Sequence, residues 1–208
     1  WGAREKLLAE KEALGYFFSG HLFDLVENET KEIPLTKLKD IKAKSEPFWI
    51  RGIVSAKRRQ ITRRGSIEII EIDDGEAKVE VNLFNELYEK VFEKIIIDQL
   101  VLVLANVENE EYTGGLRIIA NDLMNITDMR KKFASRILIE MVQKNPDRDL
   151  SEAQLKELKK FLTEKKSTKD EGLPVSIKVQ IDNLFCELKL SSQWKIIPDD
   201  EILNKIKL

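Results

Sequence analysis

The sequence predicts a mainly β chain with α+β parts, in which a five-stranded barrel follows a helical stem and precedes a small α+β domain. Three observations lead to this prediction. Apolar residues recur at helical spacing near the start of the chain, alternate with polar residues from Phe48 onward, and mix both periods after residue 128. The hydrophobic content of 42% in 208 residues is ordinary for a chain that buries a core.

Residues 1–45 are predicted to form a helical stem and a connector. Apolar residues fall at helical spacing in REKLLAEKEALG, and Gly15 is placed to end that helix. The stretch that follows, up to Pro47, has no sustained period and is interpreted as a surface connector. The chain opens on Trp1 in what reads as a helix already under way, and we therefore expect a piece of a longer protein.

Residues 46–128 carry five strand-like segments and one helix. The predicted strands cover 48–56, 66–72, 77–84, 99–107 and 116–126, and the helix covers 86–96. Gly52 inside the first strand suggests a bend or a bulge, and Asn85 is placed to cap the helix. The order strand, strand, strand, helix, strand, strand is that of the OB-fold, which binds oligonucleotides across its second and third strands.

The side-chain pattern of two elements in this segment predicts which face is buried. The core-facing residues expected on the third strand are Ala77, Val79, Val81 and Leu83. The apolar stripe expected on the helix consists of Leu87, Tyr88, Val91, Phe92 and Ile95. Both elements should therefore pack against one barrel core.

A strongly basic stretch, SAKRRQITRRGS, is predicted to be the loop that joins the first and second strands. Residues 46–128 hold 10 Lys and Arg against 16 Asp and Glu, and half of those cations lie between 57 and 64. The whole chain has a net charge of −2, so any attraction for nucleic acid must be local. The phosphate-binding candidates are Lys57, Arg58, Arg59, Arg63 and Arg64. The alternative is a solvated loop that only adds solubility.

Further nucleic-acid contacts are expected beside this loop. Trp49 and Tyr112 are the candidates for stacking on bases, and Phe84 is less favoured. Trp49 has the strand parity of Arg51, which suggests exposure, although an aromatic on a strand often packs under a neighbouring element. Arg117 is expected to add a phosphate contact.

Residues 129–208 are predicted to form a small α+β domain. A helix is expected over SEAQLKELKKFL, with Ser151 as its cap, and a last helix is expected after Pro198. The runs VSIKVQI and FCELKLS suggest a hairpin. The buried edge of the first helix should consist of Leu155, Leu158 and Leu162.

The sequence shows no pattern typical of a catalytic, metal or cofactor site. His21 is the only histidine, and Asp73-Asp74 and Asp199-Asp200 are interpreted as a hairpin turn and a helix start. We therefore expect no catalytic residue, no metal ligand and no cofactor in this chain. A single cysteine, Cys186, and no apolar run near the roughly 20 residues of a membrane helix indicate a cytoplasmic protein without a membrane anchor.

Several motifs resemble one family, the alpha subunit of bacterial DNA polymerase III, which is the catalytic subunit of the replicative polymerase. The resemblance rests on EKEALGYFFSGH, QITRRGS, IDDGEAKVEVNLF, TGGLRIIA and WKIIPDDEILNKI, and it points to the C-terminal part of that subunit. It implies that residues 46–128 bind single-stranded template DNA and that residues 129–208 engage the τ subunit of the clamp loader during holoenzyme assembly.

The same resemblance implies that the catalytic carboxylates of this nucleotidyltransferase lie outside the chain, which should therefore have no polymerase activity alone. The alternative is a non-catalytic protein-docking module without direct DNA contact. A further motif, QIDNLF, is similar to the short peptides that bind the bacterial sliding clamp, through Gln180, Leu184 and Phe185. The favoured interpretation is a hairpin turn with Phe185 in the core.

Overall fold

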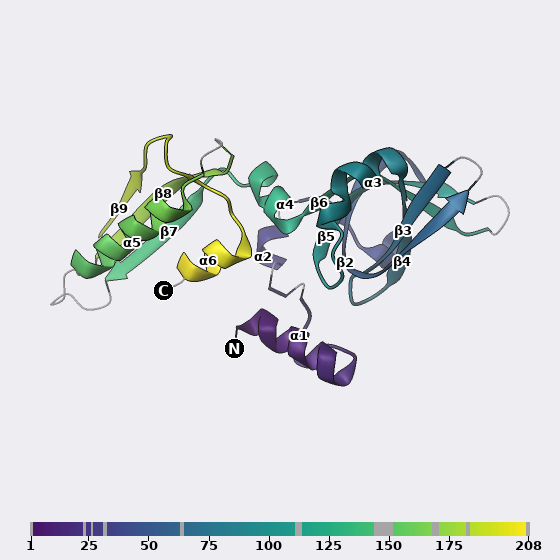
Figure 1. Cartoon of the computed structure of the whole chain (residues 1–208), viewed down its shortest axis with the longest axis horizontal. Coiled ribbons are helices and arrows are strands. Elements are labelled where there is room, and N and C mark those ends of the chain that lie inside the picture. Colours follow the sequence, from purple (N-terminus) through teal and green to yellow (C-terminus); the bar gives the residue numbers. More distant parts are fainter. Residues whose placement is uncertain are drawn as a thin grey trace. The chain divides into compact units, whose positions relative to one another are not determined.

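The computed structural model describes residues 2–22, 24–25, 27–30, 33–62, 65–110, 114–143, 152–167, 171–181 and 184–206. The chain forms two compact units, residues 1–126 and residues 127–208 (Figure 1). In the described part of the chain, no helix is long and apolar enough to cross a membrane.

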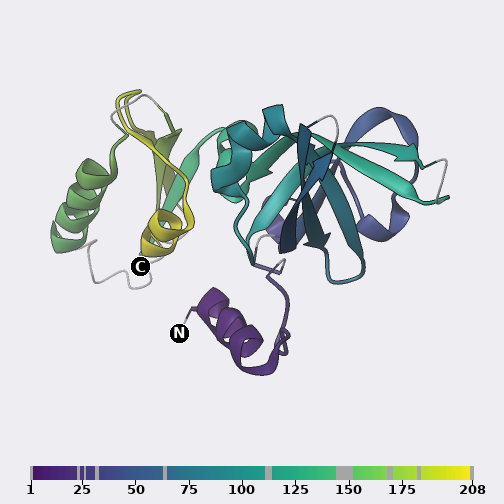
Figure 2. The same cartoon turned by 45° about the vertical axis from the view of Figure 1, so that its right-hand side comes forward.

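The first unit contains a barrel built from one six-stranded sheet. Its strands are β1 (Leu35–Thr36), β2 (Lys44–Thr62), β3 (Gly65–Asp73), β4 (Lys78–Phe84), β5 (Leu100–Asn109) and β6 (Leu116–Asn125). They lie in the order β1-β2-β3-β4-β6-β5, and the sheet closes because β2 also pairs with β5. Helix α3 (Asn85–Val91) and the 3-10 turn η2 (Phe92–Lys94) connect β4 to β5. Figure 2 shows the closed barrel from a second direction.

Strand β2 has 19 residues and serves two parts of the barrel. It pairs with β5 as far as Ile53 and with β3 from Ile53 onward. At Gly52 a Cβ atom would lie 2.7 Å from Cβ of Ile72, so a larger residue would push the two strands apart. A bulge follows between Val54 and Ala56. The irregularity expected near Gly52 is present.

The barrel core is formed by branched apolar side chains from every long strand. Val81 and Leu83 of β4 are fully buried while Lys78 and Glu80 are exposed, which confirms the alternation predicted for this strand. The helix prediction was partly wrong, because α3 ends at Val91. The 3-10 turn that follows rotates Phe92 out of the predicted stripe, and its ring is half exposed.

Two other predictions for this unit need correction. Phe84 is the N-cap residue of α3, so Asn85 is the first residue of the helix and not its cap. Its side-chain nitrogen donates to Oε1 of Glu89 instead. The predicted connector is partly regular, because β1 pairs in parallel with β2 and β2 already begins at Lys44. Pro47 lies within β2, at a shift in the register with β5, where a missing N–H is tolerated.

The stem is helix α1 (Ala3–Leu14), and the short helix α2 (Glu27–Thr30) follows it. Gly15 ends α1 in the left-handed region with φ of 83°, as glycine does most readily. Leu7 of α1 packs with Leu22 and with Ile53 of β2 in a small buried cluster. The stem is thus held to the barrel by apolar burial.

The second unit is a small α+β fold. It contains α4 (Ile126–Phe133), β7 (Ile137–Gln143), α5 (Glu152–Lys165), β8 (Leu173–Ile181), β9 (Leu184–Lys189), β10 (Lys195–Ile196) and α6 (Asp200–Ile206). The predicted hairpin is confirmed as β8 and β9, and β8 also pairs in parallel with β7. Leu162 of α5 is buried, but Leu155 is exposed, contrary to its predicted place in the core. Ser151 lies outside the described residues.

Candidate nucleic-acid interface

The basic stretch forms a strand over residues 57–62, so the prediction of a loop was wrong. Lys57, Arg58 and Arg59 stand opposite Ile70, Ile69 and Glu68 of β3 in a continuous antiparallel ladder. The backbone hydrogen bonds of this ladder are satisfied by β3, and charged side chains are tolerated because the hairpin surface is in contact with water. Arg63 and Arg64 lie outside the described residues.

Strand alternation divides these cations between two sides of the hairpin. Ile70, opposite Lys57, is fully buried in the barrel core, so Lys57 and Arg59 have the inward parity. Arg58 points to the opposite side. This side, which we call the outer face, consists of Arg58 and Gln60 of β2, Ile67, Ile69 and Glu71 of β3, Glu80, Asn82 and Phe84 of β4, and Arg117 of β6.

The two inward cations hold the hairpin to the element that follows β4. Lys57 donates from Nζ to the carbonyl oxygen of Ile95 over 3.4 Å. Arg59 donates from Nε to Oε2 of Glu68 over 3.2 Å, and its guanidinium carbon lies 5.2 Å from the ring centre of Tyr88 in α3. The side chain of Glu68 is only 8% exposed. These contacts hold the hairpin against the rest of the barrel.

The outer cation has a different partner. Arg58 donates from Nη2 to both carboxylate oxygens of Glu80, over 2.8 and 3.0 Å. Because β3 lies between β2 and β4, this ion pair crosses the outer face beside Ile69, which is almost completely buried. The side chains of Arg58 and Glu80 are each 55% exposed, so the pair contributes little to folding.

An aromatic ring and a second arginine lie further along the outer face. Phe84, at the end of β4, is 41% exposed, and the guanidinium carbon of Arg117 lies 6.0 Å from its ring centre. Arg117 precedes the buried Ile118 on β6 and is itself exposed. The side-chain nitrogen of Asn82 donates to the carbonyl oxygen of Ile118 over 2.9 Å. The outer face thus combines an exposed ring from β4, Phe84, with Arg58 from β2 and Arg117 from β6.

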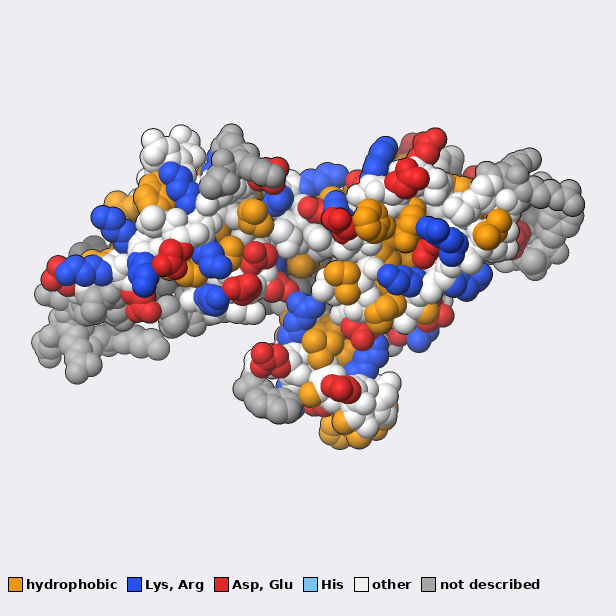
Figure 3. All heavy atoms as spheres, viewed as in Figure 1, with side chains coloured by type: hydrophobic (Ala, Val, Ile, Leu, Met, Phe, Trp, Pro, Cys, Tyr) orange, Lys and Arg blue, Asp and Glu red, His pale blue; other side chains and the backbone are white. Residues whose placement is uncertain are grey.

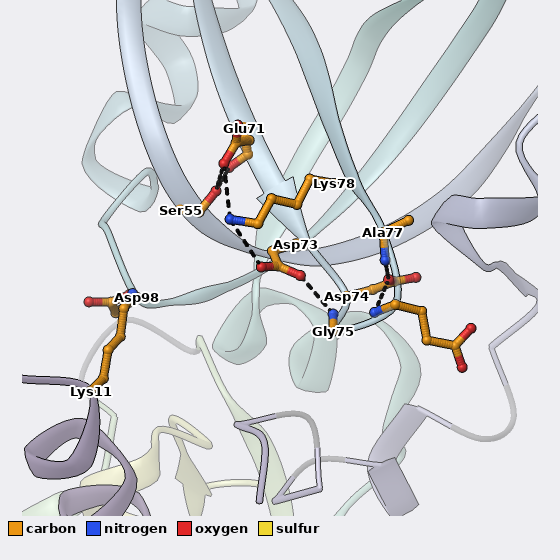
Figure 4. A network of polar contacts seen from close by, with 10 residues as sticks. Lys11, Ser55, Glu71, Asp73, Asp74, Gly75, Ala77, Lys78 and Asp98 are labelled. Carbon is orange, nitrogen blue, oxygen red and sulfur yellow. Dashed lines mark hydrogen bonds and ion pairs between the residues drawn. The ribbon is translucent and has the colours of Figure 1, made fainter. Parts of the chain in front are cut away.

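The other end of the outer face is acidic. The turn after β3 is closed by Asp73, which accepts from the backbone nitrogen of Gly75 over 2.7 Å, and by Asp74, which accepts from that of Ala77 over 2.8 Å (Figure 4). Asp73 and Glu71 each lie 3.5 Å from the Lys78 ammonium, and they raise the pKa of Lys78. The prediction of a hairpin turn is confirmed. Positive and negative side chains are interspersed on the visible face of the barrel (Figure 3).

His21 lies beside this turn. Its ring packs edge-on against Phe17, with 5.2 Å between the ring centres, and it lies under Gly75. Burial lowers the pKa of His21, and Asp73 and Asp24 oppose that effect. Among the described residues, no three His, Cys, Asp or Glu side chains are close enough to hold a metal ion.

Comparison with known proteins agrees with the fold of the barrel. Residues 48–126 match the family described as OB-fold nucleic acid binding domain. The chain is 25% identical over 210 residues to DNA polymerase III subunit alpha of Vibrio cholerae, and 26% identical over 211 residues to that of Escherichia coli K12. Each alignment covers 100% of this chain. The whole chain resembles the DNA polymerase III alpha subunit.

The chain spans 18% of the length of each of these alpha subunits. Among solved structures, the second OB-fold domain of replication protein A from Methanococcus maripaludis is 18% identical, with a TM-score of 0.35. That alignment covers 44% of this chain and 94% of the other, a partial likeness from which no function follows.

The structure separates the other predicted site residues of this alpha-like chain from the outer face. Trp49 is half buried on the part of β2 that pairs with β5, opposite Leu104, and it precedes the bulge between Val54 and Ala56. It therefore does not lie beside Arg58. Tyr112 lies outside the described residues. Phe84, which the sequence favoured less than these two aromatics, has an exposed ring next to a cation on the outer face.

The clamp-like peptide lies in the second unit. Gln180 pairs with Phe185 and Ile181 pairs with Leu184, so the segment folds back as a hairpin. The prediction that Phe185 lies in the core was wrong, because this side chain is 72% exposed. Its strand position gives it the parity of Lys178, whose ammonium lies 5.7 Å from the ring centre, on the side of the sheet opposite the buried Val175.

Proposed function

We propose that the outer face of the barrel binds single-stranded DNA, as part of an alpha-type DNA polymerase III subunit in DNA replication. One observation carries this proposal: Arg58, Arg117 and the exposed ring of Phe84 lie on one surface of an OB-fold. The arginines neutralise phosphates, and the ring stacks on a base. Binding through phosphates and stacking gives little sequence preference.

The proposal gives the rest of the chain a supporting role. Nucleotidyl transfer belongs to parts of the alpha subunit outside this chain, and the barrel guides the single-stranded template toward them. The second unit supports holoenzyme assembly, with τ of the clamp loader as its partner. The hairpin shape of the β8–β9 segment makes it a poor sliding-clamp peptide, because such peptides bind in an extended form.

Titration of a fluorescently labelled oligothymidylate with the 208-residue chain, at low and at near-physiological salt, tests the DNA proposal. The double variant Arg58→Ala with Arg117→Ala should reduce the log-log salt slope by up to about 1.4, since each phosphate contact contributes about 0.7. Phe84→Ala should cost about 1–3 kcal/mol of binding free energy at both salt concentrations.

Matched controls are Lys90→Ala on α3 and Phe92→Ala on η2, which remove an exposed cation and an exposed ring away from the outer face. They should leave binding unchanged. If the wild-type chain shows no salt-sensitive binding at low salt, the chain acts instead as a protein-docking module, and the DNA proposal is wrong.

A further inference from the structure

The ion pair between Arg58 and Glu80 occupies the place where a phosphate would bind. One nitrogen of Arg58 donates to both oxygens of Glu80, at 2.8 and 3.0 Å, the pattern that two phosphate oxygens would also satisfy. Within the described part of the chain, the structure gives the guanidinium of Arg58 no acceptor besides Glu80. A strand of DNA on the outer face must therefore compete with this carboxylate.

The exposure of the pair allows that competition. Both side chains are 55% exposed, so water can solvate Glu80 as soon as Arg58 leaves it. Arg59 could not exchange its partner in the same way. Its carboxylate, Glu68, is 8% exposed and would lose a donor without gaining full solvation. Of the two arginines, Arg58 is the one whose partner a phosphate can replace.

We propose that Glu80 is an affinity-limiting residue of the outer face, because it holds the guanidinium that a phosphate of single-stranded nucleic acid must take over. This role rests on the proposed function of that face. Each binding event breaks one ion pair and forms another, so Arg58 adds less to affinity than an unpaired arginine would. A contact of this kind favours a strand that is held weakly and released readily.

The exchange also has a signature in the salt dependence. When a phosphate binds Arg58, the DNA releases about 0.7 of a condensed cation. Glu80, left with its charge exposed, attracts a cation from solution in return, which offsets part of that release. Removal of the charge of Glu80 should therefore steepen the salt dependence of binding as well as raise the affinity.

The test is the variant Glu80→Gln in the 208-residue chain, titrated with labelled oligothymidylate over a range of salt concentrations. We expect binding at low salt to tighten by up to about fivefold, and the log-log slope to become steeper by up to about 0.7. The matched control is Glu71→Gln, which removes the same charge from the cross-strand neighbour of Glu80 on the same face. Its carboxylate is bound to Ser55 and lies 3.5 Å from the Lys78 ammonium, whereas Arg58 pairs with Glu80.

The decisive comparison adds Arg58→Ala to each variant. In that background Glu80→Gln should tighten binding no more than Glu71→Gln does. Equal effects of the two glutamine variants with Arg58 present, or a gain that survives Arg58→Ala, would show a general charge effect and overturn the role of Glu80. A wild-type chain that binds no oligonucleotide would instead overturn the proposed function, so the two failures are distinguishable.

Discussion

Arg58 and Arg59 are neighbours in β2, and each pairs with a glutamate, yet the two ion pairs differ in kind. Arg59 binds a carboxylate that is 8% exposed, and its guanidinium lies against Tyr88. Arg58 binds a carboxylate that is 55% exposed, on a surface open to solvent. The comparison teaches that burial of the acidic partner, rather than the ion-pair distance, decides whether an arginine holds the fold together or can bind something else.

The largest expected effect on stability comes from breaking the ion pair between Arg59 and Glu68, which we call the inward pair. Arg59→Ala leaves the carboxylate of Glu68 buried without its donor, so the free energy of unfolding should fall by about 1–3 kcal/mol in urea denaturation. Arg58→Ala is the matched control. It should change that free energy by no more than about 1 kcal/mol, because the Glu80 carboxylate left without its partner is 55% exposed and stays solvated. Equal losses in the two variants would contradict the distinction.

A smaller effect should follow when both members of the inward pair become apolar. The double variant Arg59→Met with Glu68→Leu removes the buried charge together with its donor, so most of the loss caused by Arg59→Ala should be recovered. The same urea denaturation series measures it. A double variant that is no more stable than Arg59→Ala would show that packing of the arginine against Tyr88, rather than the charge of Glu68, dominates.

The smallest expected effect on stability concerns His21, at the junction of stem and barrel. As with Glu68, burial of an ionisable side chain decides its effect on stability. Burial lowers the pKa of His21 in the folded chain, although Asp73, Asp24 and Asp74 favour its charged form. Between that lowered pKa and the unfolded value of about 6.5, the unfolded chain binds more protons. The contribution of His21 to stability is therefore complete above about pH 6.5 and is lost as the pH falls toward the folded pKa.

Urea midpoints measured from about pH 7.5 down to pH 5 should fall less steeply in His21→Gln than in the wild-type chain. Lys11, which opposes protonation of His21, pairs with Asp98, so Lys11→Gln should make protonation of His21 easier and weaken the dependence. Identical pH profiles for wild type and His21→Gln would exclude a role for this group.

Much of the barrel could be predicted from local pattern. The alternation in β4, the turn at Asp73 to Gly75 and the end of α1 at Gly15 each depend on residues within a few positions of one another. Predictions that depend on distant partners were less successful. The rotation of Phe92 follows from a 3-10 turn, and the exposure of Phe185 follows from which side of β8 is covered, and neither is a local property of the sequence.

The candidate site shows the same limit. The sequence located the cations, and it also noted Phe84, but it could not say which cations share a surface with that ring. Arg58 and Arg117 are 59 positions apart in the chain and meet Phe84 through the pairings of β2 with β3, β3 with β4, and β4 with β6. The carboxylate partners of Arg58 and Arg59 are likewise set by strand register, which the basic stretch alone does not contain.

The bulge at Ser55 determines which of the later residues of β2 face inward and which face outward. Before the bulge, even-numbered residues such as Ile50 and Val54 point into the core, and after it the odd-numbered residues have the inward parity, although Lys57 itself is exposed. A regular strand that kept Ser55 in the ladder would exchange the directions of Arg58 and Arg59, whereas deletion of Ser55 should leave both directions as they are. The bulge, which takes one residue out of the ladder, thus decides which arginine of the pair is presented to a ligand.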